Sequence, residues 1–346
     1  MKKLIDKLAI CHSLTKEEWC LLLKNYDTKL AEYAAAIARE TAQKRFRNNI
    51  YIRGLIEFTN ICKNDCYYCG LRCGNSHINR FRLTPEEIIN CCKNGYELGF
   101  RTFVLQGGED PGFPDEDLCR LVETIKQQYP DCAITLSVGE RPRFVYESFK
   151  KAGADRYLLR HETADDTHYH MLHPKSLSPT VRKQCLYDLK ELGFQVGTGF
   201  LVGSPFQKPE HICADLLFLQ KLQPEMIGIG PFIPHKDTPF KDHPAGSLEL
   251  TLFLISLLRL SHPDALIPAT TAVGTLEEGG RERAILCGAN VVMPNLSPKS
   301  HRKDYSLYNN KLSDGAEAAE ARKSLDARLA NIGYRTITHR GDFQKY

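Results

Sequence analysis

The sequence lacks an apolar run long enough to cross a bilayer. Its most apolar stretch, residues 248–260, is interrupted by Glu249 and Arg259, whereas a spanning helix needs about 20 apolar residues. Near the N-terminus, Asp6 and Lys7 break the apolar core that an export signal requires, and no small-residue cleavage site follows. These absences predict a soluble protein with no membrane partner.

Long basic runs are also lacking. Lys and Arg number 46 against 42 Asp and Glu, which gives no case for nucleic acid as a partner and fits a small anionic substrate equally well. We find no nucleophile elbow, phosphate loop or dinucleotide fingerprint, because Gly197-x-Gly199 lacks the third glycine. The sequence therefore contains none of the motifs that would indicate a hydrolase, a nucleotidase or a dehydrogenase.

Cysteine, by contrast, is plentiful, with thirteen residues in 346. The number is odd, and most of these cysteines lie singly in helical patterns, as Cys119, Cys185 and Cys213 do. Leftover thiols would mispair on a secretory route, so the count indicates a reducing cytoplasm.

Strand-like and helix-like segments alternate from residue 50 onward, after a helical prelude. The expected strands are 50–58, 102–105, 133–138, 156–159, 195–200, 226–229, 266–269 and 290–293. The expected helices between them lie near 84–98, 115–128, 142–152, 178–192, 209–222, 247–260 and 277–287. Eight such units favour a parallel (β/α)8 barrel of the TIM type over an open sheet, with a six-unit partial barrel as the alternative.

This pattern predicts three regions. They are an N-terminal helical extension (1–48), the barrel (49–296) and a C-terminal tail that closes the barrel (297–346). Chemistry is expected at the carboxyl ends of the strands.

Three cysteines with C-x3-C-x2-C spacing follow the first barrel strand. Because a 4Fe-4S cluster takes one thiolate per iron, Cys62, Cys66 and Cys69 can hold three irons and leave the fourth open. Cys73 follows four positions later and leaves a four-sulfur zinc knuckle as the alternative. A structural zinc site usually joins two separated cysteine pairs, so the spacing favours the cluster.

Polar residues follow several other strands. Gly107, Gly108 and Glu109 could approach a ligand closely and receive an ammonium group, although such a sequence can be a plain turn. The side chains of Arg160 and Glu162 should point to the same side of the strand. They would form either a structural ion pair or a binding site for a zwitterionic ligand.

The cysteine spacing, with an aromatic residue before the last cysteine, resembles that of radical S-adenosylmethionine (SAM) enzymes. Several sequence segments together resemble one family of these enzymes, the HydE maturases of FeFe hydrogenases. The segments are residues 53–60, 104–111, 154–163, 228–235 and 267–272, and the resemblance extends from about residue 50 to 310.

The resemblance implies a role for each of several residues. Cys62, Cys66 and Cys69 would hold the cluster, with its open iron binding SAM. Tyr68, Gln106, Gly107, Gly108, Glu109, Thr135, Ser137, Glu162, Arg182 and Met226 would surround SAM. Arg160, Thr270, Thr271, Met293 and Tyr305 would contact the substrate.

The resemblance also implies partners. The substrate would be a small anionic iron complex, a cysteine-bound iron carbonyl cyanide made by the maturase HydG, and the product would move towards HydF. A flavodoxin or ferredoxin would supply low-potential electrons. Some family members carry three further cysteines near the C-terminus, but none follows Cys287 here, so we expect one cluster only.

Other functions fit parts of the pattern. An amino-acid mutase such as methylornithine synthase also needs a carboxylate grip and no second cluster. A sulfur-inserting enzyme like biotin synthase would need ligands for a second cluster, for which we see no clear cysteine set. An iron–sulfur sensor or carrier is the non-enzymatic alternative.

Overall fold

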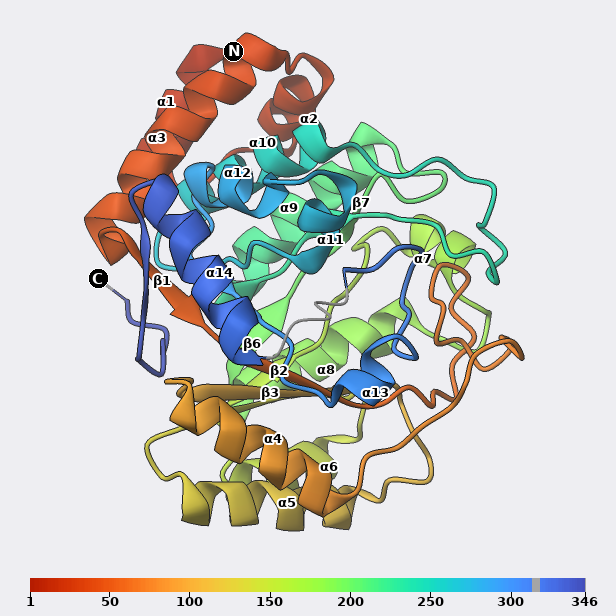
Figure 1. Cartoon of the computed structure of the whole chain (residues 1–346). Helices are drawn as coiled ribbons and strands as arrows, with labels where there is room; N and C mark the ends of the chain where they lie inside the picture. The colour runs from red at the N-terminus through yellow and green to blue at the C-terminus, as the bar shows by residue number, and fades with distance from the viewer. Residues whose placement is uncertain (313–317, 346) are drawn as a thin grey trace.

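The computed structural model describes residues 1–312 and 318–345 of the chain (Figure 1). The strands are β1 (Asn49–Ile52), β2 (Gly54–Thr59), β3 (Thr102–Gly107), β4 (Ala133–Ser137), β5 (Arg156–Leu158), β6 (Gln195–Thr198), β7 (Leu201–Val202), β8 (Met226–Ile227), β9 (Gly230–Pro231), β10 (Val291–Val292) and β11 (Arg335–Ile337). The helices are α1 (Lys2–Cys11), α2 (Lys16–Lys24), α3 (Thr28–Phe46), α4 (Pro85–Glu97), α5 (Asp115–Gln128), α6 (Arg143–Lys151), α7 (Asp166–Leu172), α8 (Pro179–Glu191), α9 (Pro209–Leu222), α10 (Leu248–Ser261), α11 (Thr271–Leu276), α12 (Gly280–Leu286), α13 (Lys299–Arg302) and α14 (Ala318–Asn331).

Parallel pairing builds the centre of the molecule. Six strands are hydrogen-bonded in the order β2-β3-β4-β5-β6-β8, and every pair is parallel. Beyond β8, single bridges join Met226 to Leu266 and Pro268 to Val291. Strand β10 then pairs with β1, which runs on into β2. The ring therefore closes with eight strand positions, and the predicted α/β barrel is confirmed.

One predicted strand is less regular than expected. Residues 266–269 take part in isolated bridges only and form no ladder. Pro268 lies inside this stretch and has no backbone N–H to donate, which limits a ladder there. Most predicted helices agree with the structure to within two residues, and the capping boxes at Thr15 and Thr84 are both present. The 277–287 helix is the exception, because α12 starts three residues later, at Gly280.

The N-terminal helices form an outer layer on one side of the barrel. Figure 1 shows α1 and α3 beyond α10, and the helices α3 and α10 pack directly against each other. Trp19 on α2 is fully buried and donates its indole N–H to Gln220 Oε1 on α9 at 2.6 Å. The extension is therefore anchored to the barrel by apolar packing and a buried hydrogen bond.

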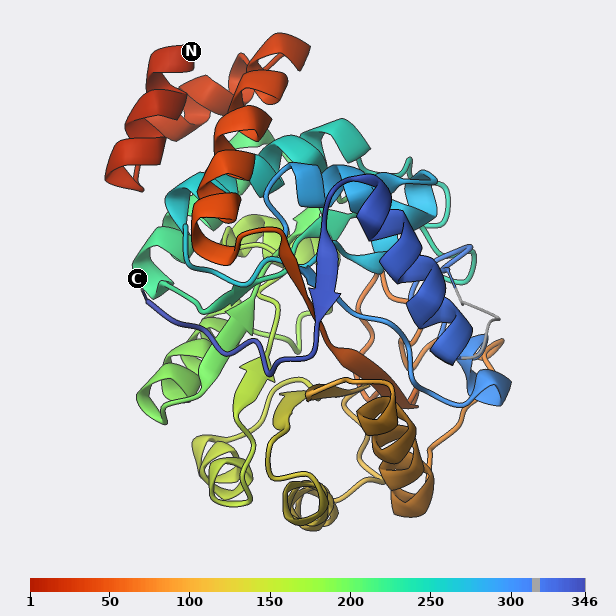
Figure 2. The ribbon, with the colours of Figure 1, turned by 60° about the vertical axis from the view of Figure 1, so that its left-hand side comes forward.

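The C-terminal part of the chain touches both ends of the barrel. At the carboxyl ends of the strands, Leu307 O accepts from Gly70 N at 2.9 Å, beside the cysteine loop. At the opposite end, β11 pairs with β1, as Figure 2 shows, and Asp342 accepts from the buried Arg156 at 2.7 Å. The division into regions at 48/49 and 296/297 stays a prediction.

In the described residues, no helix is both long and apolar enough to cross a membrane.

Replacing Trp19 by alanine tests the anchoring of the N-terminal layer. Loss of a buried aromatic side chain costs about 3–5 kcal/mol, so we expect Trp19→Ala to lower the denaturant midpoint clearly. Leu21→Ala is the control, because Leu21 lies on the same helix and is 48% exposed. Equal midpoints for the two variants would contradict the anchoring.

Candidate active site

The three cysteines of the motif lie on the long loop that leads from β2 to α4 at the carboxyl ends of the strands. Cys62, Cys66 and Cys69 are half-buried there, whereas Cys73 is exposed. Beyond Cys69 the chain is covered by the C-terminal segment, because Gly70 packs against Ser306 O and His235. The loop thus has a protected face, formed by the motif cysteines, and an exposed face with Cys73.

Arg80 fixes the shape of the cysteine loop. Its guanidinium donates to four backbone carbonyls, those of Asn60 at 2.7 Å, Leu71 at 2.8 Å, Arg72 at 2.7 Å and Asn75 at 3.1 Å. A loop without secondary structure must satisfy its carbonyls in some such way. Sequence reasoning missed Arg80, because nothing local marks an arginine whose partners lie up to twenty positions away.

A second set of contacts ties the loop to the end of β3. Lys63 N donates to Glu109 O at 2.9 Å. A Cβ on Gly108 would lie 2.2 Å from Ile61 O and 2.7 Å from Cys62 Cβ, so only glycine allows this approach. The structure shows that Gly108 approaches the cysteine loop closely, and the expected close approach to a ligand stays a prediction.

The side chain of Glu109 is also engaged within the protein. Its Oε1 accepts from Glu140 N at 3.0 Å, and its Oε2 lies 3.3 Å from Lys63 Nζ. The next residue, Asp110, forms a two-pronged ion pair with Arg82 at 2.7 and 2.8 Å. Burial opposes the charge of Asp110, but the donors Arg82 and Thr59 outweigh it and lower the pKa of the carboxyl.

The thiols fit a cluster that supplies compensating charge. Burial raises the pKa of Cys69 to about 12, and burial together with the neighbouring cysteines raises that of Cys66 well above its ordinary value. Iron binds thiolates, so cluster loading would release these protons. In the described residues no three His, Cys, Asp or Glu side chains converge on one ion position.

Arg160, Glu162 and Arg182 come together where β5 ends. Arg160 Nη2 lies 3.3 Å from Glu162 Oε2, so the predicted pair faces one side. Arg182 on α8 donates to the Arg160 carbonyl at 3.2 Å and pairs with Glu140. Arg160 Nε is buried and has no hydrogen-bond partner in the described chain, and Glu162 Oε2, although ion-paired with Arg160, accepts no hydrogen bond there. Unsatisfied polar atoms of opposite charge are what a zwitterionic ligand would satisfy.

Tyr68 reaches towards the same group from the cysteine loop. Its hydroxyl lies 3.2 Å from His173 Nε2, and His173 stacks on Tyr169 at 3.9 Å between ring centroids. Burial, followed by the negative charge of Glu162, raises the pKa of Tyr68 well above its ordinary value. The phenol is therefore neutral and available as a hydrogen-bonding group.

Gln106 and Tyr305 meet above the barrel interior. Gln106 Nε2 donates to Tyr305 Oη at 3.2 Å, and Tyr305 is 1% exposed. Ser137 pairs in register with Gln106, whereas Thr135 lies two residues deeper, opposite Arg156. Thr135 Oγ1 is buried and has no hydrogen-bond partner among the described residues.

Met226 and Met293 belong to one apolar cluster lower in the barrel. Arg53 Nη1 lies 2.8 Å from Met226 Sδ, and its Nε and Nη2 have no hydrogen-bond partner in the described part of the chain. Burial lowers the pKa of Arg53 well below its ordinary value. Sequence reasoning missed Arg53, which read as an ordinary strand residue.

The two predicted threonines differ in their surroundings. Thr270 is the N-cap residue of α11, and its buried hydroxyl has no hydrogen-bond partner in the described residues. The hydroxyl of Thr271 accepts from Arg281 at 3.4 Å. Thr270 is therefore the more available of the two for a ligand.

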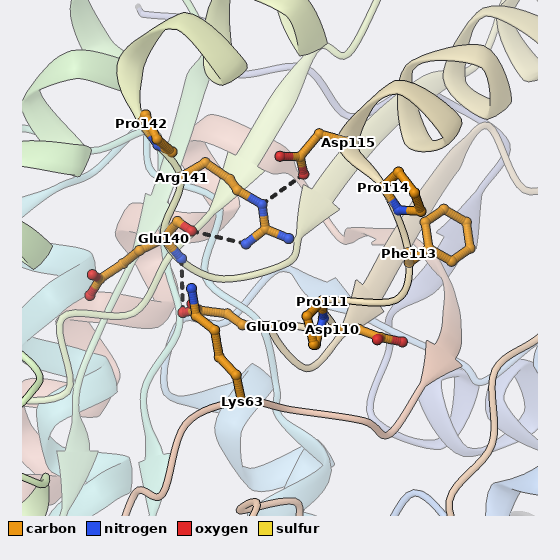
Figure 3. A pocket seen from close by; sticks show the side chains of 10 residues that line it. All are labelled: Lys63, Glu109, Asp110, Pro111, Phe113, Pro114, Asp115, Glu140, Arg141 and Pro142. Atoms are coloured by element: carbon orange, nitrogen blue, oxygen red, sulfur yellow. Dashed lines mark hydrogen bonds and ion pairs between the residues drawn. The ribbon is translucent and has the colours of Figure 1, made fainter.

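A cavity of about 300 Å³ opens beside the cysteine loop (Figure 3). Its charged residues contact one another, since Arg141 donates to Asp115 at 2.8 Å and Lys63 lies next to Glu109. Among the predicted site residues, only Glu109 lines it. We assign no ligand to this surface cavity.

A closed parallel barrel with a three-cysteine loop at its carboxyl rim defines a radical SAM enzyme, and the model of the radical SAM superfamily matches residues 56–219. The chain is 43% identical over 311 residues to a protein of Thermotoga maritima named as the FeFe hydrogenase maturase subunit HydE, covering 90% of this chain and 88% of that protein. The chain belongs to the HydE family.

Two further relatives are more distant. A 3-methylornithine synthase of Methanosarcina barkeri is 29% identical over 342 residues, covering 98% of this chain and 95% of that protein. The crystal structure of methylornithine synthase (PylB) superposes with a TM-score of 0.85 at 28% identity, covering 96% of this chain and 97% of the other. A structure of the maturase HydG, with a TM-score of 0.81 and 22% identity over 96% of this chain and 75% of that one, shows the fold alone.

Family membership decides several questions that the residues left open. The chain is an enzyme rather than a sensor, and the family implies a 4Fe-4S cluster and SAM rather than a structural zinc.

Replacing Arg80 tests its hold on the cysteine loop. We expect Arg80→Ala to lose bound iron several times faster than the unchanged protein, because four loop carbonyls lose their donor. Iron release to a chelator, followed by absorbance under anaerobic conditions, measures this rate. Arg143→Ala is the control, since Arg143 is 42% exposed and pairs with Asp188 and Glu191 on α8 rather than with the loop carbonyls. An unchanged release rate would contradict the role of Arg80.

Proposed function

We propose that this chain matures FeFe hydrogenase by radical SAM chemistry on a small anionic iron-containing substrate. The observation that carries this function is the 43% identity to the Thermotoga maritima maturase over nearly the whole of both chains. The arrangement of the described side chains supports each part of the proposal.

The protein's part in the chemistry begins with the cysteine loop. Cys62, Cys66 and Cys69 would hold the cluster and leave one iron without a protein ligand, while exposed Cys73 stays outside. When bound, the cluster and SAM supply a 5'-deoxyadenosyl radical. The loop and the covering segment around Tyr305 would keep water away from the reacting groups.

The side chains around the end of β5 suit SAM. We assign Glu162 and Arg182 to its charged methionyl groups and Tyr68 to a contact from the cysteine loop. Gln106, Gly107, Gly108, Glu109, Thr135, Ser137 and Met226 complete the proposed cofactor site. Gly108 and Glu109 would also hold the cysteine loop, because they contact Ile61, Cys62 and Lys63, whereas Gly107 packs against the end of β2 at Phe58 and Thr59.

The barrel interior suits an anion. Arg160 and Thr270 offer unsatisfied donors near the mouth, and Arg53 offers two more at a deeper level. Arg53 is buried and forms no ion pair with a carboxylate in the described residues, which is costly, and an anionic ligand would remove that cost. Thr271, Met293 and Tyr305 complete the proposed substrate site.

The proposed partners follow from the family. The substrate would be a cysteine-bound iron carbonyl cyanide complex supplied by HydG, and the product would pass towards HydF. A flavodoxin or ferredoxin would supply low-potential electrons. The proposed regions are the extension (1–48), the barrel (49–296) and the tail (297–346).

A methylornithine synthase activity is the second candidate. Its support is the TM-score of 0.85 and the coverage of both chains almost in full. Incubating the reduced, cluster-loaded protein with SAM and lysine tests it directly. Formation of methylornithine would favour the mutase over the maturase.

Replacing single cysteines tests the cluster ligands. We expect Cys66→Ala to lose nearly all iron and SAM cleavage while keeping the circular dichroism of the fold, because each ligand holds one iron. Cys73→Ala is the matched control on the same loop and should keep about four irons per chain. Loss of iron in both variants would instead support a four-cysteine site.

A gene deletion tests the function in the cell. A host that lacks this chain should have an inactive FeFe hydrogenase, and the unchanged gene should restore its activity. Arg160→Ala should restore at least tenfold less activity, although its Kd for SAM should change much less, because Arg160 is assigned to the substrate. Arg143→Ala, on the outer surface, should restore full activity. An active hydrogenase in the deletion strain would refute the proposed function.

A further inference from the structure

The backbone at Glu162 has an uncommon conformation. Its φ is 64°, in the left-handed region that residues other than glycine rarely adopt. Glu162 also carries the carboxylate assigned above to SAM. Such a conformation persists only where the surroundings hold it, and it often marks a functional position.

The residue before Glu162 points away from the barrel interior and is anchored behind it. His161 is 1% exposed, and its Nδ1 lies 2.9 Å from Thr198 Oγ1 on β6. The same hydroxyl accepts from His161 N at 3.2 Å. Thr198 therefore holds both the side chain and the backbone of His161.

Asp215 on α9 contacts residues on both sides of Glu162, namely His161 and Ala164. Its Oδ1 accepts from Ala164 N at 2.5 Å and lies 3.3 Å from His161 Nε2. Asp215 and the His161 ring are fully buried. One carboxylate thus spans residues 161–164 from behind, while Glu162 N donates to Gly199 O at 3.0 Å.

This buried polar group has no role in the chemistry assigned so far. Burial raises the pKa of Asp215 well above its ordinary value and lowers that of His161 to about 3, so His161 is neutral. A buried carboxyl beside a neutral imidazole adds little Coulombic attraction, and an apolar pair would fill the same space. In the described residues His161 Nε2 has no hydrogen-bond partner, so the hydrogen bond from Ala164 N to Asp215 is the directed contact that an apolar pair could not supply.

We propose that Asp215, with His161 and Thr198, is a positioning group that holds Glu162 in its left-handed conformation so that its carboxylate can bind SAM. The inference rests on the proposed role of Glu162. None of the three residues is assigned a contact with SAM or the substrate; they act through the backbone of residues 161–164.

The first test compares SAM affinity in Asp215 variants of the full-length, cluster-loaded protein by equilibrium dialysis. Asp215→Ala removes the acceptor for Ala164 N and should weaken SAM binding at least tenfold. Asp215→Asn keeps an acceptor oxygen of the same shape and should stay within threefold of the unchanged protein. Equal weakening by both, or by neither, would overturn the inference.

A double-mutant cycle separates positioning from a general loss of stability. In a Glu162→Ala background, Asp215→Ala should change the Kd for SAM less than twofold, because the carboxylate that it positions is gone. Full tenfold weakening in that background would show that Asp215 acts by another route and would overturn the inference. If Asp215→Ala does not fold, Thr198→Val enters the same cycle.

The single Glu162 variant distinguishes the inference from the proposed function. If Glu162→Ala leaves SAM binding unchanged, the assigned role of Glu162 is wrong and the inference falls with it. If Glu162→Ala weakens binding but Asp215→Ala does not, only the inference fails.

His262 provides a matched control, because its ring is also buried and contacts Ser261 Oγ at 2.8 Å and Leu219 O at 3.2 Å. It is the C-cap of α10 and contacts α9 at Leu219, but no hydrogen bond or ion pair in the described residues joins it to residues 160–164. His161→Ala and His262→Ala should both lower the melting temperature, but only His161→Ala should weaken SAM binding. Equal effects on SAM affinity would overturn the inference.

Discussion

The close approach of two backbone segments, Ile61–Lys63 and Gly108–Glu109, is the constraint on which the proposed site depends. A side chain at Gly108 would collide with the Ile61 carbonyl at 2.2 Å, so the missing Cβ decides where the cysteine loop can lie. Arg80 then fixes the remainder of the loop through four carbonyls. Backbone packing therefore limits where the loop that carries the three thiols can lie.

The proposed site contains two guanidinium groups with incomplete hydrogen bonding, one near the mouth of the barrel and one deeper. Arg53 and Arg160 both carry nitrogens without hydrogen bonds among the described residues. Burying such groups without an anion costs free energy, which is acceptable where the ligand itself completes the network. These unsatisfied polar atoms are the features of the packing on which the proposed anionic substrate depends.

The outer parts of the chain support the barrel in different ways. The N-terminal helices cover it through apolar packing around Trp19. The C-terminal part reaches both ends, with Leu307 beside the cysteine loop and Asp342 on the buried Arg156. Behind β5, the buried residues His161 and Asp215 belong to neither layer and face the backbone of the site instead.

Local sequence determined the helices, most strands and the cluster motif, because periodicity, capping residues and C-x3-C-x2-C spacing act over a few neighbouring residues. The irregular seventh strand position of the barrel, residues 266–269, and the late start of α12 were less well predicted, since tertiary packing sets such boundaries. Only the tertiary structure decided that Gly108 packs on the cysteine loop and that Arg80 holds it. Those contacts join residues far apart in the chain, and their energies depend on distances that no local pattern contains.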